Sequence, residues 1–346
     1  MSERQSGARA TIHDVAARAG VATSTVSRAL SDPGRISART RNLVLQAAEA
    51  LDYVPNSGRR PGVAARTRAV ALLVPDITNP FYFDIIHGAQ EQLKAAGYTQ
   101  LLVDTEESAD VEMVALERAM TTADGVILAA SRLPETVLAG AVHRIPLVTI
   151  NRNDSVVPTV LIDTTMGVQQ AVEHLVSLGH RRIAFVSGPA KSWTNQWRWQ
   201  AFEAAASRHG VEALRIGPYA PKPTSGAAAA DAVLISAATA CIAFNDLLAI
   251  GMLQRFNARG VRVPGDFSIV GCDDIFGADF CNPPLTTITA PIEQAGRVAT
   301  SMLLAALRTG QPAMHQPGGK HPGVHQVTRL PTHLTIRDST GPAPSE

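Results

Sequence analysis

Residues 11–30 of the chain read TIHDVAARAGVATSTVSRAL, and this stretch predicts two short helices joined by a sharp turn. The apolar residues of its first half recur at the i, i+3, i+4, i+7 spacing of one helix face. They are Ile12, Val15, Ala16 and Ala19. Thr11 is placed to cap the first turn, and Gly20 supplies the corner before the second helix.

The second predicted helix, residues 23–30, carries a short polar face. Its apolar stripe is Val26, Ala29 and Leu30, which leaves the hydroxyls and the arginine on the other side: Thr23, Ser24, Ser27 and Arg28. Such a helix fits the major groove of DNA, where hydroxyls meet base edges or phosphates and an arginine can donate two hydrogen bonds to guanine. The spacing alone leaves an ordinary helical hairpin equally open.

Charge is divided unevenly along the chain, although the net charge is only +1. Residues 1–68 hold 11 Lys+Arg and 5 Asp+Glu, which leaves 20 of the 31 basic and 25 of the 30 acidic residues for the remainder. The head is therefore +6 and the body −5. A basic head favours a polyanion such as DNA.

The body, from residue 69, alternates apolar runs with helical patterns. Continuous apolar strands of this kind are buried on both faces, which predicts parallel sheets flanked by helices and, over this length, two lobes with a cleft between them. The predicted strands are 69–74, 101–103, 125–130, 146–150, 183–186, 214–216, 240–244, 268–270, 285–290 and 334–337. The predicted helices are 81–96, 108–121, 134–143, 165–178, 195–208, 225–237, 247–258 and 292–308.

Composition places the chain among cytosolic proteins of more than one domain. It has 346 residues, 45% of them hydrophobic, and no apolar run approaches the roughly 18 residues of a membrane helix. We expect no signal peptide, because no apolar stretch follows the charges of the N-terminus. The three cysteines are expected to be reduced and buried: Cys241, Cys272 and Cys281.

Polar residues follow several predicted strands, where ligands of two-lobed α/β proteins bind. The candidates are Asp76, Tyr82, Asn151, Arg152, Asp163, Arg198, Asn245, Asp246, Asp273 and Asp274. Carboxylates, amides, an arginine and an aromatic ring suit a polyhydroxylated ligand. Asp163 is as readily a cap of helix 165–178, Asp246 is better read as the cap of helix 247–258, and Trp193 with Trp197 as a packed helix face.

No cofactor or metal is expected. The histidines of the C-terminal part, which are His315, His321, His325 and His333, lack cysteine partners and a metal-ligand spacing. The sequence also lacks the Gly-x-Ser-x-Gly and Gly-x-Gly-x-x-Gly signatures of common α/β enzymes.

The amino-acid sequence of the head resembles that of the LacI/GalR family of bacterial repressors. The motifs that carry the resemblance are Asp14-Val15-Ala16, Ala19-Gly20-Val21, Ser24-Thr25-Val26-Ser27-Arg28, Thr40-Arg41 and Tyr53-Val54-Pro55-Asn56. The body is similar to periplasmic sugar-binding proteins and to the core of the same family, in phrases such as 75–82, 178–184, 244–246, 271–274 and 283–287.

This resemblance implies an α/β fold with an N-terminal three-helix helix-turn-helix head and a two-lobed periplasmic-binding-protein-like core with parallel sheets. The head is expected at 1–55, a linker at 56–68 and the core at 69–346. Lobe one would take 69–163 plus 291–325, and lobe two 164–290 plus 326–340. The family's minor-groove wedge falls on Gly62 beside Pro61, so we expect the wedge to be absent or replaced by Val63.

The resemblance also implies site residues. Base-reading positions fall on Thr23, Ser24 and Arg28, and phosphate-contacting or structural ones on Thr25, Ser27 and Asn56. Because Ala22 stands where relatives have a capping residue, Thr23 could cap the helix instead. Effector contacts fall on Tyr82, Asn151, Arg152, Asp163, Arg198, Asn245 and Asp273.

We therefore expect a cytoplasmic, bacterial transcriptional regulator, most simply a repressor that associates with the nucleoid when bound. Its partners would be a pseudo-palindromic double-stranded DNA operator, a small effector such as a sugar, and a second copy in a homodimer or a tetramer, without a membrane. The alternatives are a solute-binding protein with no role on DNA and a sugar-modifying enzyme.

Overall fold

The computed structural model describes residues 11–31, 36–51, 67–153, 156–309 and 326–344. It separates into two compact units, residues 1–66 and 67–346. The expectations for Asn56, for the linker at 61–63 and for three of the histidines fall outside the described residues: His315, His321 and His325.

The first unit is a bundle of α1 (Ile12–Ala19), α2 (Thr23–Ser31) and α3 (Ala38–Glu49). Gly20 turns the chain between α1 and α2 in the left-handed region, with φ of 65°. The core of the bundle is small: Val15, Ala16, Val26, Ala29, Val44, Ala47 and Ala48. The apolar spacing predicts that this third helix, capped by Ser37 and running to about Leu51, turns five residues inward: Leu43, Val44, Ala47, Ala48 and Leu51. The prediction for Leu43 is wrong, because the buried residues of α3 are Val44, Ala47 and Ala48, and Leu43 is 47% exposed.

The second unit contains two sheets of six strands each within the described ranges. The first sheet has the order β11-β5-β4-β3-β1-β2 and the second the order β12-β10-β9-β8-β6-β7. The first consists of β1 (Ala69–Val74), β2 (Thr99–Asp104), β3 (Gly125–Ala129), β4 (Leu147–Ile150), β5 (Thr159–Asp163) and β11 (Val327–Pro331). The second consists of β6 (Arg182–Val186), β7 (Glu212–Ile216), β8 (Ala240–Ala243), β9 (Ser268–Asp273), β10 (Thr286–Thr289) and β12 (His333–Thr335).

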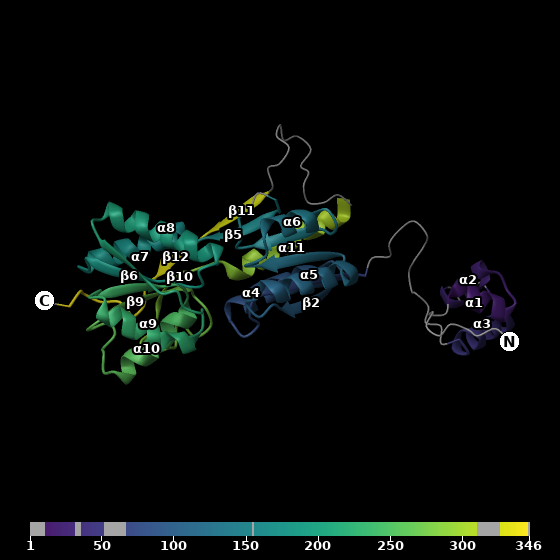
Figure 1. Ribbon diagram of the computed structural model, residues 1–346, viewed down its shortest axis with the longest axis horizontal. Helices are drawn as coiled ribbons and strands as arrows, with labels where there is room; N and C mark the ends of the chain where they lie inside the picture. The colour runs from purple at the N-terminus through teal and green to yellow at the C-terminus, as the bar shows by residue number, and fades with distance from the viewer. Residues whose placement is uncertain (1–10, 32–35, 52–66, 154–155, 310–325, 345–346) are drawn as a thin grey trace, which may run out of the picture. The chain divides into compact units, whose positions relative to one another are not determined.

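Helices cover both faces of each sheet, as the continuous apolar strands predict (Figure 1). The first lobe holds α4 (Phe81–Ala95), α5 (Ala109–Thr122), α6 (Glu135–Val142) and α11 (Ile292–Thr309). Alternate residues of β1 illustrate the two covered faces, because Leu72 packs in the cluster with α4 and α11 while Leu73 packs in the cluster with α5 and α6. The second lobe holds α7 (Thr165–Ser177), α8 (Trp193–Arg208), α9 (Gly226–Ile235), α10 (Asp246–Ala258) and the 3₁₀ turn η2 (Pro223–Ser225).

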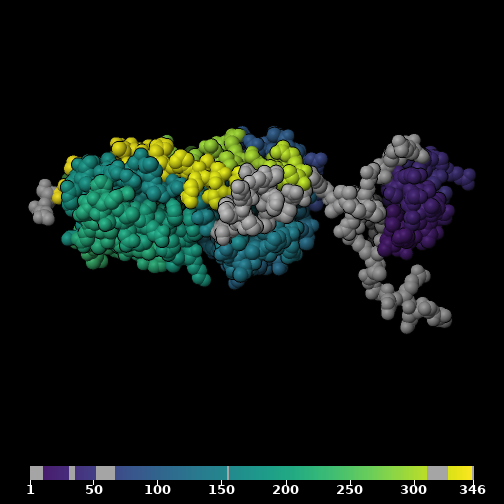
Figure 2. Space-filling view, turned by 90° about the horizontal axis from the view of Figure 1, so that it is seen from above, coloured from purple at the N-terminus to yellow at the C-terminus, as the bar shows by residue number. Residues whose placement is uncertain are grey.

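The predicted fold class is confirmed, but one lobe boundary and two strands need correction. Residues 326–340 do not all belong to the second lobe, because β11 pairs in parallel with β5 in the first sheet and only β12 joins β10, antiparallel, in the second. Neither β5 nor β11 was predicted. The sequence of β11, VTRLP, contains no continuous apolar run, because only Leu330 of this edge strand is buried and the other positions need not be apolar. Figure 2 shows the C-terminal stretch, in yellow, lying on the surface along both lobes.

None of the helices in the described ranges is long and apolar enough to cross a membrane.

Gly88 in α4 and Gly296 in α11 allow these two helices to pack closely. A β-carbon on Gly88 would lie 2.2 Å from the carbonyl oxygen of Glu293, and one on Gly296 would lie 2.3 Å from that of Ile85. The contact is between backbones, so neither side can yield by moving a flexible side chain.

Replacing Gly88 by alanine should therefore lower the free energy of unfolding of the core by about 1–3 kcal/mol, the usual cost of overpacking. Urea denaturation followed by circular dichroism measures this. The matched control is Gly140→Ala on the exposed face of α6, where nothing lies within 4 Å of an added β-carbon and helix propensity should raise stability slightly. Equal behaviour of the two variants would contradict the tight crossing.

Candidate functional site

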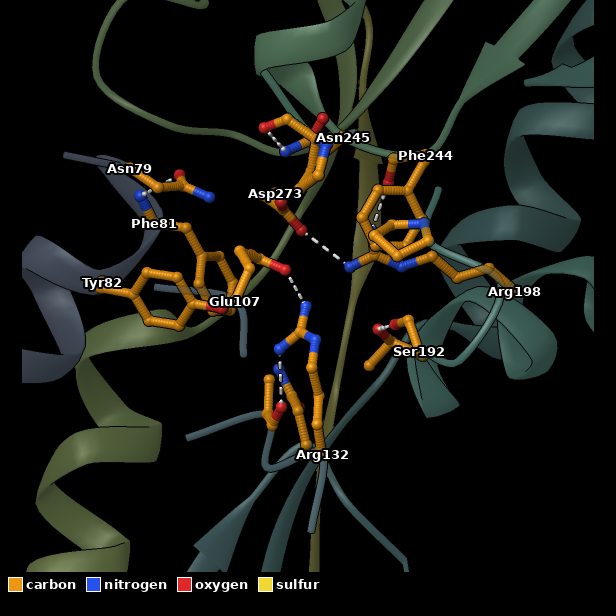
Figure 3. A pocket seen from close by; sticks show the side chains of 15 residues that line it. Asn79, Phe81, Tyr82, Glu107, Arg132, Ser192, Arg198, Phe244, Asn245 and Asp273 are labelled. Carbon is orange, nitrogen blue, oxygen red and sulfur yellow. Dashed lines mark hydrogen bonds and ion pairs between the residues drawn. The ribbon is translucent and has the colours of Figure 1, made fainter. Parts of the chain in front are cut away.

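A cavity lies between the two lobes of the second unit, at the carboxyl ends of their parallel strands (Figure 3). Its volume is about 50 Å³. In both sheets the strand order reverses beside the first strand of the lobe, β1 or β6, and ligands bind outside the carboxyl ends of strands at such a point. The lining residues are Asn79, Phe81, Tyr82, Glu107, Ala130, Arg132, Asn151, Pro189, Ser192, Thr194, Arg198, Pro221, Phe244, Asn245 and Asp273.

Left-handed backbone conformations gather at this cavity. Four lining residues other than glycine have positive φ: Glu107 (58°), Ala130 (46°), Asn151 (58°) and Asp273 (117°). Each sits at or just beyond the end of a strand, where the chain must turn sharply to enter the next loop. Such conformations cost roughly 1–3 kcal/mol each and cluster at binding and catalytic sites. The cavity is therefore the strongest candidate for the functional site of this unit.

The second lobe contributes a buried ion pair. Arg198 Nη2 donates to Asp273 Oδ1 at 2.7 Å, and both side chains are only 6% exposed. The other terminal nitrogen of Arg198 donates to the carbonyl oxygen of Phe244, and the guanidinium lies 5.0 Å from the centroid of the Phe244 ring. Burial raises the pKa of Asp273, and the charge of Arg198 opposes that shift.

The first lobe contributes a second ion pair that the sequence analysis missed. Arg132 follows β3 and pairs with Glu107, which follows β2, and Arg132 Nη1 also donates to the carbonyl oxygen of Ala130 at 3.3 Å. Burial raises the pKa of Glu107, with Arg132 acting in the opposite direction. The signal was available in the sequence, because both residues follow predicted strands, 101–103 and 125–130.

Five of the seven residues expected to contact an effector line the cavity: Tyr82, Asn151, Arg198, Asn245 and Asp273. Tyr82 is buried, with its ring 5.1 Å from that of Phe81 in an edge-to-face arrangement. Asn151 Oδ1 accepts from the amide of Ile162 at 3.0 Å. Asn245 Oδ1 accepts from the amide of Leu248 at 3.0 Å, so Asn245 is the cap of α10.

The expectation that Asp246 caps this helix is therefore wrong. Asp246 is the first residue of α10, and its two oxygens accept from the hydroxyl of Thr287 and the amide of Ile275 at 2.6 and 2.9 Å. These partners tie α10 to the second sheet. Burial, and to a lesser extent the charge of Asp273, raises the pKa of Asp246 to about 7.

Arg152 and Asp163 do not line the cavity. Arg152 Nη1 donates to the carbonyl oxygen of Ser131 at 3.1 Å. Asp163 Oδ1 accepts from both the amide and the hydroxyl of Thr165, but the N-cap of α7 is Thr164, so Asp163 stands one residue before the cap that the sequence left open for it. Trp193 and Trp197 stack on each other at 5.3 Å, as expected of a packed helix face.

On the head, α2 presents the expected polar face. Ser24, Ser27 and Arg28 are exposed, while Thr23 and Thr25 are partly buried. Ala22 stands at the cap position, where its carbonyl oxygen accepts from the amides of Thr25 and Val26. Thr23 is consequently the first residue of the helix and is not its cap.

One exposed cluster has the residue types of a metal site. It contains His87, Glu91 and Glu293. Arg297 forms ion pairs with both glutamates, so a guanidinium already supplies the positive charge there.

Replacing Asp273 by asparagine should destabilise the second lobe by about 3 kcal/mol, because Arg198 would remain buried without a counter-charge. All three tryptophans of the chain lie on α8, so tryptophan fluorescence during urea denaturation reports this lobe. The control is Asp266→Asn, which breaks an exposed ion pair with Arg262 and should cause a much smaller loss. Equal losses would contradict the account of the pair.

The raised pKa of Asp246 predicts a pH dependence. Its folded pKa of about 7 lies above the value of 3.8 for an exposed carboxyl, so the folded state binds this proton more tightly than the unfolded state. The contribution of this proton to stability is present near pH 4 and is lost as the pH rises to about 7.

We therefore compare the urea midpoint of Asp246→Asn with that of the unaltered chain at the same pH. The difference, variant minus unaltered chain, should be more positive at pH 7 than at pH 4.5. The same fluorescence signal measures the midpoint, and Asp279→Asn, at an exposed position, serves as control. A constant difference between Asp246→Asn and the unaltered chain across this range would contradict the assignment.

Comparisons with known proteins agree with both units. Residues 11–56 match bacterial regulatory proteins of the lacI family, and residues 172–340 match the periplasmic binding protein-like domain. The transcriptional repressor CytR of Escherichia coli (strain K12) is 33% identical over 353 residues, which cover 99% of this chain and all of that protein.

Solved structures show the same fold. The complex of the transcriptional regulator CelR with cellobiose is 30% identical with a TM-score of 0.68, covering 96% of this chain and all of that one. The lac repressor dimer bound to operator and the anti-inducer ONPF has a TM-score of 0.68 over the same shares of the two chains, at 24% identity. The chain therefore belongs to the lacI family: it is a DNA-binding transcriptional repressor with a periplasmic-binding-protein-like core, and not an enzyme.

Proposed function

We propose that this repressor binds its operator as a homodimer and that a carbohydrate held in the cavity between the lobes controls its operator affinity. The observation that carries the proposal is the lining of the cavity, where amides, carboxylates and guanidinium groups surround three aromatic rings: Phe81, Tyr82 and Phe244. Polar groups of this kind bind hydroxyls, and aromatic faces cover the apolar side of a sugar ring. The protein acts in the bacterial cytoplasm, on the nucleoid.

In this proposal the exposed face of α2 enters the major groove. Thr23, Ser24 and Arg28 read base edges, while Thr25, Ser27 and Asn56 contact phosphates or support the head. One short helix discriminates too little between sequences, so two heads on a dimer would read a pseudo-palindromic site. The lac repressor with the same fold is a dimer on its operator.

The effector contacts we propose are the five expected residues that line the cavity, namely Tyr82, Asn151, Arg198, Asn245 and Asp273. Arg152 and Asp163 do not line the cavity, so in this proposal they do not contact the effector and instead hold their hydrogen-bond partners, Ser131 and Thr165, in place. A volume of about 50 Å³ is smaller than the roughly 150 Å³ cavity that holds benzene, which supports the proposal that the cavity widens when a sugar binds. CelR, a similar protein, has been solved with cellobiose. Because binding linkage is reciprocal, a ligand that favours one separation of the lobes changes the affinity for DNA.

The direct test is a gel shift on the DNA upstream of the protein's own gene, repeated with a panel of sugars. The proposal predicts a retained complex that survives random competitor DNA at moderate salt, and a change in affinity with at least one sugar. Binding that shows no preference over the competitor would contradict the operator role, and operator binding that no sugar alters would contradict the effector role.

Replacing Arg28 by alanine should weaken operator binding by about tenfold or more, since a paired contact to guanine is worth about 1–3 kcal/mol. Fluorescence anisotropy on operator and on random DNA measures it. The operator should lose more affinity than random DNA. The control is Arg118→Ala, which removes an exposed charge from α5 of the core. Equal losses on both DNAs would place Arg28 on phosphate instead of a base.

A further inference from the structure

The two ion pairs of the cavity face it from opposite sides, one from each lobe. Figure 3 shows the Glu107–Arg132 pair and the Arg198–Asp273 pair pointing into the same space. These four are the charged residues among those that line the cavity. The described lining therefore carries two positive and two negative charges and no net charge.

Two further ion pairs and two buried carboxylates, Asp246 and Glu112, lie near the lining. Lys222 of the second lobe lies 3.3 Å from Asp76 of the first, and Arg337 lies 2.8 Å from Asp274. Glu112 adds a further carboxylate beside Arg132, because its Oε2 accepts from the Arg132 amide at 2.8 Å and its side chain is buried. An incoming anion would thus meet cations whose charge is already balanced by carboxylates.

The energetic consequence differs for neutral and charged ligands. A neutral polyol can donate to the outer lone pairs of the carboxylates and accept from the guanidinium groups without separating either pair. A phosphate or carboxylate that used the same guanidinium donors would lie beside the carboxylates of Glu107 and Asp273, whose repulsion offsets the attraction of the arginines. To avoid that repulsion it would have to displace a carboxylate from its arginine, which leaves a partly buried charge without its partner. The aromatic rings on both sides favour the apolar face of a sugar ring in either case, so they do not decide between the two.

We propose that the cavity selects a neutral polyhydroxylated ligand over phosphorylated or acidic ones, and that Glu107 enforces this by neutralising Arg132. The proposal rests on the effector function of the cavity and adds the charge class of the ligand.

Glu107 is suited to this role by its position. The amide of Glu107 donates to the carbonyl oxygen of Pro75 at 2.8 Å, and the amide of Glu106 donates to Asp104 Oδ1 at 2.8 Å. These bonds hold both residues in the left-handed region, with φ of 58° and 53°. The loop therefore directs the Glu107 carboxylate toward Arg132, while Glu106 next to it is exposed and lies outside the lining.

Inorganic phosphate is the probe that tests this without knowledge of the natural ligand. Melting temperatures of the full chain are measured in phosphate and in chloride at matched ionic strength, for the unaltered protein and for Glu107→Gln and Glu106→Gln. We expect Glu107→Gln to gain a saturable stabilisation by phosphate, with an affinity about tenfold or more above that of the other two proteins, because Arg132 gains a free donor set. The double variant Glu107→Gln with Arg132→Met should lose this gain.

Several outcomes would overturn the proposal. One is saturable stabilisation of the unaltered protein by phosphate, and another is a Glu107→Gln variant that folds, by circular dichroism, but gains none. A third is a phosphorylated sugar that stabilises the unaltered protein more than its neutral parent, with ribose and ribose 5-phosphate, and glucose and glucose 6-phosphate, as the pairs compared. Should Glu107→Gln fail to fold, the sugar pairs still decide. Failure of the effector function itself would appear separately, as operator binding that no sugar alters.

Discussion

The carboxyl ends of the parallel strands of both sheets meet at one cavity. This arrangement determines which residues line the proposed ligand site. In a parallel sheet every strand delivers its next loop to the same edge, so residues from distant parts of the sequence gather there. Arg198 and Asp273 are 75 residues apart and Arg132 and Glu107 are 25 apart, yet each pair is in direct contact. Residues with left-handed backbone conformations make the necessary turns at the strand ends. The conformational strain of these residues lies at the site where the ligand is proposed to bind.

Three segments connect the two lobes, and the lobes also touch through their cores. The chain passes between the sheets at 163–165, at 289–292 and at 331–333. Ile275, which follows β9 of the second sheet, packs in the core of the first lobe. One crossing is fixed by Thr332, whose hydroxyl donates to the carbonyl oxygen of Asp163 at 3.0 Å. Gly167 lies beside it, where a β-carbon would be 2.7 Å from the same hydroxyl oxygen.

Apolar patterning predicted the core well. Continuous runs such as 69–74 and 268–270 predict strands buried on both faces, and in the structure each of these strands has a neighbouring strand on either side. The edge strand β11 could not be found in this way, since its sequence is half polar and one of its sides has no strand neighbour. The placement of Leu43 failed for a related reason, because a face of three small apolar residues, Val44, Ala47 and Ala48, is enough to cover so small a bundle.

The candidate site was partly predictable. Residues that follow strands could be chosen from the sequence, and five of the seven effector candidates do line the cavity. That Asn245 and not Asp246 caps α10 could not be foreseen, because adjacent polar residues at a helix start compete for the same amide and only the backbone geometry decides. Which carboxylate balances which arginine is likewise a property of three-dimensional loops.

We propose that ligand binding in the cavity is coupled to operator binding. The most direct measurement is the dissociation constant of a bound sugar, obtained once with the free protein and once with the protein saturated by operator DNA. Linkage predicts that operator changes the sugar's dissociation constant by the same factor by which the sugar changes that of the operator. A sugar affinity that is identical in the presence and absence of operator would contradict the coupling.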